Sequence, residues 1–271
     1  MNRRYLCAAL VPVALVAQLS KAQGNSRTQQ DSVIFKAVSE LSFDRTKPSL
    51  IGARVADPAE YPATFYTSQG SGMCTSTLVG PRAMLTAAHC VRDGSTARLQ
   101  HKRQSYTAVC THAPDYKTNN TADWALCVVD RPLPGIRYER VNIDPARLSV
   151  GMELLLSGFG CTKTDATGGN DGVYRIGESP IQRLPSGVSN DIETRGGAAL
   201  CFGDSGGPAF AVNVPANGQR LQVSVNSRGN IRDRSLLSSL STSNAIAFLK
   251  DWSKQFGTQI CGVDSNTPDC R

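Results

Sequence analysis

The sequence predicts an all-β domain, a barrel or a sandwich, followed by a single C-terminal helix. Short β-branched and apolar runs recur between clusters of Gly, Pro, Asn and Asp, as in TFYT, STLVG, WALCVV, ELLLSGF and LQVSV. Helical spacing is clear only near the C-terminus, where Ser243 can cap a helix whose apolar stripe is Ile246, Leu249, Trp252 and Phe256. That stripe is expected to pack on the β structure as part of the core.

The N-terminal 22 residues are typical of a cleavable secretory signal. Two arginines precede an apolar run from Tyr5 to about Leu19, and small residues follow it. The run is too short to cross a bilayer comfortably, so an uncleaved membrane anchor is the weaker alternative. Residues 23–49 are polar and weakly patterned, which suits a propeptide or a linker. We therefore expect a secreted protein with no stable membrane insertion.

Charge does not indicate a nucleic-acid partner. Residues 1–49 hold seven Lys and Arg and three Asp and Glu, so their removal leaves 222 residues and lowers the formal charge from +7 to +3. No cluster of basic residues is interleaved with aromatic residues in the remainder. The remaining length suits one all-β domain. The stretch 162–172 has no strand pattern and is expected to be an exposed loop.

Eight cysteines remain once Cys7 leaves with the signal. An even number in a secreted chain favours disulfides, and no CxxC pair is present to favour a zinc site. The histidines also lack acidic or cysteine neighbours at metal-ligand spacing, so no metal or other cofactor is expected. Sequence alone does not fix the connectivity. We propose that neighbours pair in order, as Cys74–Cys90, Cys110–Cys127, Cys161–Cys201 and Cys261–Cys270.

Three short motifs carry the residue types that acyl transfer by a serine needs. His89 lies in LTAAHC, Asp123 in TADWALCVVD and Ser205 in GDSGGP. A serine nucleophile needs a base to take its proton, and the base needs a buried carboxylate to hold its tautomer and stabilise its cation. The three motifs together therefore predict a Ser-His-Asp triad.

From Leu50 to Phe256 the sequence resembles the chymotrypsin-like, or trypsin-family, serine endopeptidases. The order His, Asp, Ser fits that family rather than the subtilisins or α/β-hydrolases. The resemblance implies two six-stranded antiparallel β-barrels with a C-terminal α-helix, in a peptidase domain over residues 50–260 and a stapled tail over 261–271. It also implies polypeptide substrates and a monomer. By this resemblance His89 is the general base and acid, Asp123 is the partner that orients it, and Ser205 is the nucleophile.

The glycines around Ser205 imply an oxyanion hole by the same resemblance. Gly203 allows a tight turn in which the amides of Gly203 and Ser205 point at one spot. Each such donor is worth roughly 3 kcal/mol where charge develops on the attacked carbonyl oxygen.

Asp204 is expected to receive the ammonium of a newly cut N-terminus, as the matching acid does in the family. A buried carboxylate needs such a partner. The matching segment is LIGARVADPAEYP, which implies a zymogen cut between Ser49 and Leu50 or one bond later, by an activating protease. Ser49 departs from the family's Arg or Lys, so a trypsin-like activator is not expected at that bond.

The substrate pocket is expected to involve Ala199, Ser227, Arg228 and Gly229. Ala199 stands six residues before the serine, where trypsin-like members carry Asp, so a preference for Arg or Lys is not expected. Uncharged, medium-sized side chains are favoured, and the alternative is an acidic side chain recruited by Arg228, Arg232 or Arg234. Arg228 replaces the family's usual aromatic residue. The family's cysteine after this strand is also missing, which is why Cys201 is assigned to Cys161.

Two other functions compete with a secreted serine endopeptidase. One is a binding protein that kept the fold and lost the chemistry, although no triad residue is missing. The other is an esterase of another fold, but Ser205 has no GxSxG surroundings. Asn119 begins an NNT glycosylation sequon, whose use depends on the host.

Overall fold

A computed structural model describes residues 33–38, 41, 52–69, 72–166, 168, 171–211, 220–264, 267 and 269–270. All of them belong to one compact unit, Asp31–Arg271. The predicted signal lies outside the described residues. No helix in the described part of the chain combines the length and the apolar character that a membrane crossing needs.

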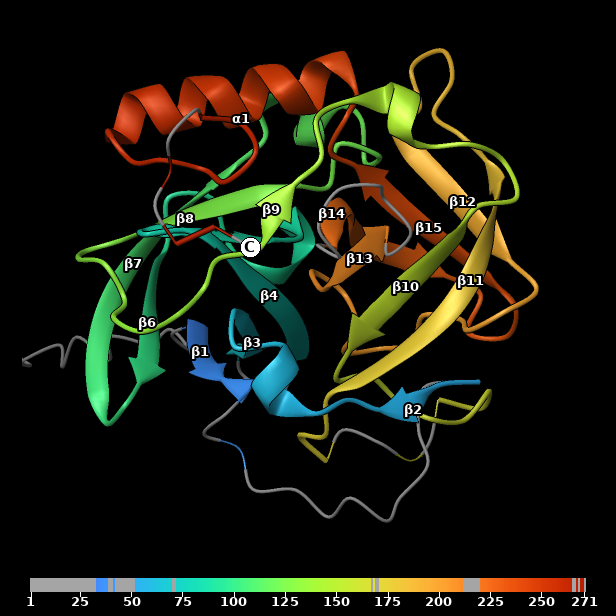
Figure 1. Ribbon diagram of the computed structural model, residues 1–271, viewed down its shortest axis with the longest axis horizontal. Helices are drawn as coiled ribbons and strands as arrows, with labels where there is room; N and C mark the ends of the chain where they lie inside the picture. The colour runs from blue at the N-terminus through green and yellow to red at the C-terminus, as the bar shows by residue number, and fades with distance from the viewer. Residues whose placement is uncertain are drawn as a thin grey trace, which may run out of the picture. The chain divides into compact units, whose positions relative to one another are not determined.

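The first barrel has seven strands and is closed, in the order β1, β3, β4, β5, β8, β7, β6. Figure 1 shows it in blue, teal and green. Its strands are β1 (Val33–Ala37), β3 (Thr64–Gln69), β4 (Gly72–Gly80), β5 (Ala83–Thr86), β6 (Thr96–His101), β7 (Gln104–His112) and β8 (Ala125–Val129).

The second barrel closes through six strands, in the order β10, β13, β14, β15, β12, β11 and back to β10. Two further short strands extend this barrel. Strand β2 pairs with β11, and β9 pairs with β14. The bounds are β2 (Arg54–Val55), β9 (Arg140–Val141), β10 (Glu153–Gly158), β11 (Arg175–Arg183), β12 (Asp191–Arg195), β13 (Pro208–Ala211), β14 (Leu221–Gly229) and β15 (Arg234–Ser239).

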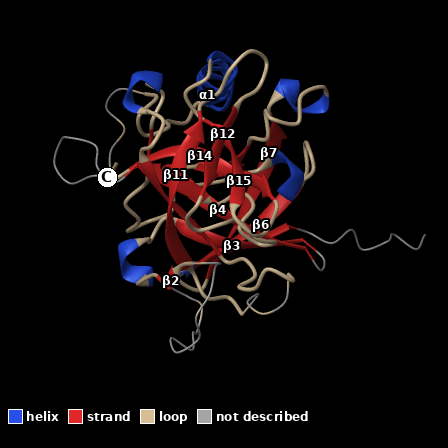
Figure 2. Cartoon of the chain, turned by 90° about the vertical axis from the view of Figure 1, so that its right-hand side faces the viewer, coloured by secondary structure: helices blue, strands red, loops and turns tan. Residues whose placement is uncertain are grey.

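The chymotrypsin-like all-β fold is thus confirmed, with one difference in the first barrel. Seven strands close it rather than six, because β1 pairs antiparallel with β3 and parallel with β6. The sequence predicts no strand here, because β1 lies in the weakly patterned segment 23–49, interpreted as a propeptide or linker. Strands fill the centre of the described structure and helical segments lie around it (Figure 2).

The helices of the described residues are short except for α1 (Ser243–Phe256). Thr242, not Ser243, caps it, because the Thr242 side chain accepts a hydrogen bond from Ala245 N. The helix ends at Gly257, which adopts the left-handed conformation that glycine tolerates. The 3₁₀ helices are Pro58–Glu60, Ala88–Cys90, Pro114–Lys117 and Pro145–Arg147.

Four disulfides join the same cysteine pairs as those proposed from the sequence. Cys110 and Cys127 are directly opposite each other on β7 and β8, so that bond fastens two neighbouring strands. Cys74–Cys90 fastens β4 to the 3₁₀ helix that carries His89. Cys161–Cys201 fastens the chain after β10 to the loop before Ser205. Two of the four bonds therefore lie beside the predicted catalytic residues.

Candidate active site

The three predicted catalytic residues come from three separate elements. His89 is on the 3₁₀ helix Ala88–Cys90 that follows β5. Asp123 lies two residues before β8, and Ser205 lies in the loop before β13. His89 and Ser205 line one cavity of about 360 Å³. The turn after β5 and the segment just before β8, both in the first barrel, thus bring imidazole and carboxylate to a loop of the second.

Asp123 is the most heavily hydrogen-bonded residue of this group. Its Oδ2 lies 2.7 Å from His89 Nδ1 and accepts the Ser227 hydroxyl at 2.6 Å, while its Oδ1 accepts His89 N at 3.0 Å. The residue is only 2% exposed. Burial by itself raises the pKa of Asp123, but the hydrogen bonds from His89 and Ser227 outweigh it and hold that pKa below its ordinary value.

This arrangement fixes the tautomer of His89. Because the low pKa keeps Asp123 ionised and able only to accept, Nδ1 of His89 must donate to it. In the neutral imidazole Nε2 then carries a lone pair. Within the described residues, the Ser205 hydroxyl donates to Ser227 O at 3.4 Å and makes no hydrogen bond with His89. Catalytic hydrogen bonds are often long or misaligned in the absence of substrate.

Ser227 is a residue whose contact the sequence did not reveal. This residue, expected to line the substrate pocket, donates its hydroxyl to Asp123, and its carbonyl accepts the Ser205 hydroxyl. Its neighbour Arg228 donates to Ser227 Oγ at 3.1 Å and pairs with Asp191 at 2.5 Å. No local pattern in VSVNSRG distinguishes a serine that contacts a distant carboxylate.

The loop before β13 turns sharply around Ser205. Gly203 has φ of 105° and Gly206 φ of 80°, values that favour glycine. A side chain at position 206 would approach Thr75 O to 2.2 Å. Thr75 also holds two carbonyls of this loop, since its amide donates to Ser205 O at 2.7 Å and its hydroxyl to Gly203 O at 2.9 Å. Within the described residues, the amides of Gly203 and Ser205 make no hydrogen bond.

Asp204 is fully buried behind this loop. Its Oδ1 accepts Gly160 N at 2.7 Å and its Oδ2 accepts Cys201 N at 2.8 Å. Burial raises the pKa of Asp204 to about 7, against the opposing effect of these two amides. A Cβ at Gly160 would lie 2.5 Å from the carboxylate carbon, so glycine is needed there. The SGFG motif therefore makes room for Asp204, a role that sequence analysis did not assign.

Two segments of the predicted pocket, around Ala199 and Gly229, both contact Ser235 of the second barrel. Ala199 is fully buried, and Leu200 N next to it donates to Ser235 Oγ at 3.0 Å. Arg228 at 34% side-chain exposure is held by Asp191, and Gly229 pairs with Ser235 across β14 and β15. The guanidinium of Arg228 is therefore already bound by an acid.

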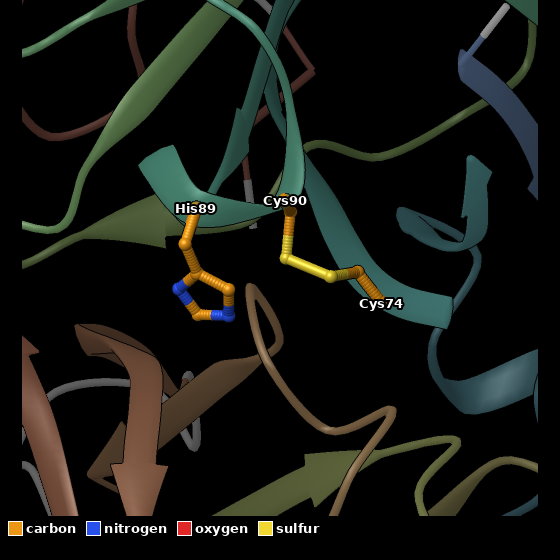
Figure 3. Close-up of side chains that lie close together, drawn as sticks. All are labelled: Cys74, His89 and Cys90. Carbon is orange, nitrogen blue, oxygen red and sulfur yellow. A yellow bond between two sulfur atoms is a disulfide. The ribbon is translucent and has the colours of Figure 1, made fainter. Parts of the chain in front are cut away.

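A possible metal-binding group is ruled out by its own chemistry. Cys74, His89 and Cys90 lie close together (Figure 3). The two sulfurs are joined in a disulfide, however, so neither offers the thiolate that a metal needs.

Comparison with known proteins agrees with the family that the sequence motifs resemble. The Trypsin family matches residues 50–236. The chain is 45% identical to the cercarial protease of Schistosoma mansoni, over 62% of this chain and 77% of that protein. It is 26% identical to serine protease SP24D of Anopheles gambiae (60% and 68%) and 27% identical to phenoloxidase-activating factor 3 of Holotrichia diomphalia (65% of each). The chain therefore belongs to the trypsin family of chymotrypsin-like serine proteases.

Proposed function

We propose that this protein is a secreted serine endopeptidase, made as a zymogen, that cleaves polypeptides through His89, Asp123 and Ser205. The observation that carries the proposal is the hydrogen-bonded group of His89, Asp123 and Ser227, with Ser205 on the same cavity. Secretion is supported by the N-terminal signal pattern and by the disulfides, which persist in oxidising compartments.

The proposed reaction begins with a small rotation of the Ser205 side chain toward His89 Nε2. The hydroxyl oxygen attacks the peptide carbonyl while Nε2 takes its proton, and Asp123 stabilises the resulting imidazolium. His89 then gives the proton to the leaving amine, which leaves an acyl group on Ser205. Water, activated by the same imidazole, hydrolyses that ester and restores the enzyme.

The amides of Gly203 and Ser205 are the proposed donors to the oxyanion. Both are without a protein acceptor within the described residues, while the carbonyls of the same two residues accept hydrogen bonds from Thr75. Preorganised donors of this kind cost no rearrangement when charge develops.

Activation is proposed to supply a cation to Asp204. The proposed cut, at Ser49–Leu50 or one bond later, falls outside the described residues. Gly52, the first described residue after it, lies next to Ala198, because a Cβ at Gly52 would be 3.8 Å from Ala198 Cα. Ala198 is six residues before Asp204 along the same loop. A new N-terminal ammonium near position 50 could thus reach a carboxylate that accepts from two backbone amides within the described residues.

Reaction with a fluorophosphonate probe tests the proposed activity. The chain cut near Ser49 is expected to be labelled at Ser205, and the Ser205→Ala variant is expected to remain unlabelled. Asp123→Asn is expected to react far more slowly, because labelling also needs the base. A folded, cut chain that takes no label would favour instead the catalytically silent binding protein.

Substrate preference at the cut bond is proposed to be for uncharged, medium-sized side chains. Ala199 provides no acid for Arg or Lys, and two arginines that could recruit an acid are already paired, Arg228 with Asp191 and Arg234 with Glu193. Cleavage of a peptide library is therefore expected to select uncharged residues, with Arg232→Ala as a control that leaves the selection unchanged. Strong selection for Arg or Lys, or an acidic preference lost in Arg232→Ala, would contradict this expectation.

A further inference from the structure

Strand β1 lies outside the part of the chain that matches the family, which begins at residue 50. It nevertheless pairs along both of its edges. Phe35 is opposite Thr67 of β3 on one side and Leu99 of β6 on the other. Figure 1 shows β1 in blue beside β3. A segment predicted as a propeptide thus contributes a strand to the peptidase barrel.

The side chains of β1 alternate between core and surface. Val33, Phe35 and Ala37 are at most 1% exposed and belong to the main core of the first barrel, whereas Lys36 is exposed. Val38, also fully buried, belongs to a second cluster that includes Phe159 and other residues of the second barrel. The segment is therefore packed as an internal strand and contacts both barrels.

The barrel is closed only through β1. Among the described strands, β3 and β6 each pair with β1 and not with each other. With two strand spacings between them, β3 and β6 are about 10 Å apart, too far for direct hydrogen bonds. Loss of β1 would leave the facing edges of β3 and β6 without hydrogen-bond partners. It would also expose to solvent the core residues that pack on Phe35.

We propose that the peptide carrying residues 33–38 remains bound between β3 and β6 after the activating cut, so that the mature protease is a noncovalent two-chain complex. The cut itself rests on the proposed function. Retention of the strand depends on its contacts with the barrel. These contacts are the pairing of β1 with β3 and β6 and the burial of Phe35, and neither needs the covalent link to residue 50. Cys7 is the only cysteine before residue 50, so no disulfide can hold this peptide once the signal is removed.

The test uses the secreted full chain with Ser49→Arg and Ser205→Ala. The first change lets trypsin cut after position 49, in the segment between β1 and β2 that also holds Arg45. The second change prevents self-digestion. After cutting, the protein is passed through a size-exclusion column in native buffer and then in denaturant, and each peak is weighed by mass spectrometry. The N-terminal peptide is expected to coelute one-to-one with the domain in native buffer and to separate in denaturant.

Matched variants show whether the strand contacts hold the peptide. Phe35→Ala is expected to speed its loss at least about 100-fold, as the cost of emptying a buried Phe site implies. Lys36→Ala, on the exposed face of the same strand, is expected to leave the rate unchanged. If Phe35→Ala does not fold, Phe35→Leu serves in its place, with a smaller increase.

Release of the peptide from the cut parent in native buffer would overturn the proposal, whatever the stability of the remaining domain. Equal rates of loss for Phe35→Ala and Lys36→Ala would overturn it as well. Because these chains carry Ser205→Ala, the result does not depend on peptidase activity. Failure of fluorophosphonate labelling in the Ser205 protein would contradict the proposed function alone.

Discussion

The Asp123→Asn variant is expected to hydrolyse peptides with kcat about 10⁴-fold lower than the parent, the loss typical of this change in a Ser-His-Asp triad. Asparagine has nearly the same shape, so the protein is expected to fold. Its NH₂ group cannot accept from His89 Nδ1, however, and the ring is expected to take the other tautomer. Nε2 then carries the proton and cannot accept one from Ser205.

Two controls separate loss of the base from loss of structure. Asp130→Asn changes an exposed carboxylate just beyond the other end of β8 and is expected to leave kcat unchanged. Ser227→Ala removes one of the donors to Asp123 and is expected to lower kcat by about 10- to 100-fold, the range for one hydrogen bond to a charged group. Circular dichroism and the melting temperature would report whether each variant is folded. More than about 1% of parental kcat in Asp123→Asn would contradict the role given to Asp123.

Motifs allowed the general fold and the three candidate catalytic positions to be predicted, because each is marked by neighbours in sequence. His89 is flanked by Cys90, and Ser205 is surrounded by glycines that make its turn. The fold class followed from short strands between turn residues. The order of the cysteines gave pairs that the structure also has.

What sequence analysis missed depends on contacts between distant segments. The pattern of β1 is five residues long in polar surroundings, and its partners are about 30 and 60 residues later in the chain. Ser227 contacts Asp123 across 104 positions. Thr242 and Ser243 are both good caps, and only the backbone conformation decided between them. In each case a local preference was compatible with several structures, and packing selected one.

The free energy of unfolding of the uncut chain is expected to contain a contribution from Asp204 that falls as the pH rises from about 4 to about 7. The carboxyl is fully buried between two backbone amides, and burial raises its pKa to about 7 from the ordinary 3.8. Between these pH values the folded chain keeps the proton and the unfolded chain does not. The folded state therefore loses stability with rising pH, by roughly 4 kcal/mol in total, and the loss is complete above pH 7.

Urea unfolding between pH 4 and 8 would measure this contribution in the Ser205→Ala background. Asp204→Asn carries a neutral group at every pH, so the difference between the two chains isolates Asp204 from all other titrating groups. If the free energy of unfolding depended on pH equally in both chains, burial would not raise the pKa of Asp204 as described here.

The same measurement on the cut chain tests how activation acts on Asp204. An ammonium beside the carboxylate favours its charged form and lowers its pKa, so the fall in stability between pH 4 and 7 is expected to disappear after cutting. The free energy of unfolding of the cut chain should then change little between pH 4 and 7, whereas that of the uncut chain falls. Identical curves for the two would mean that the new N-terminus does not reach Asp204. In that case the carboxylate could not link the cut to the order of the Gly203 loop.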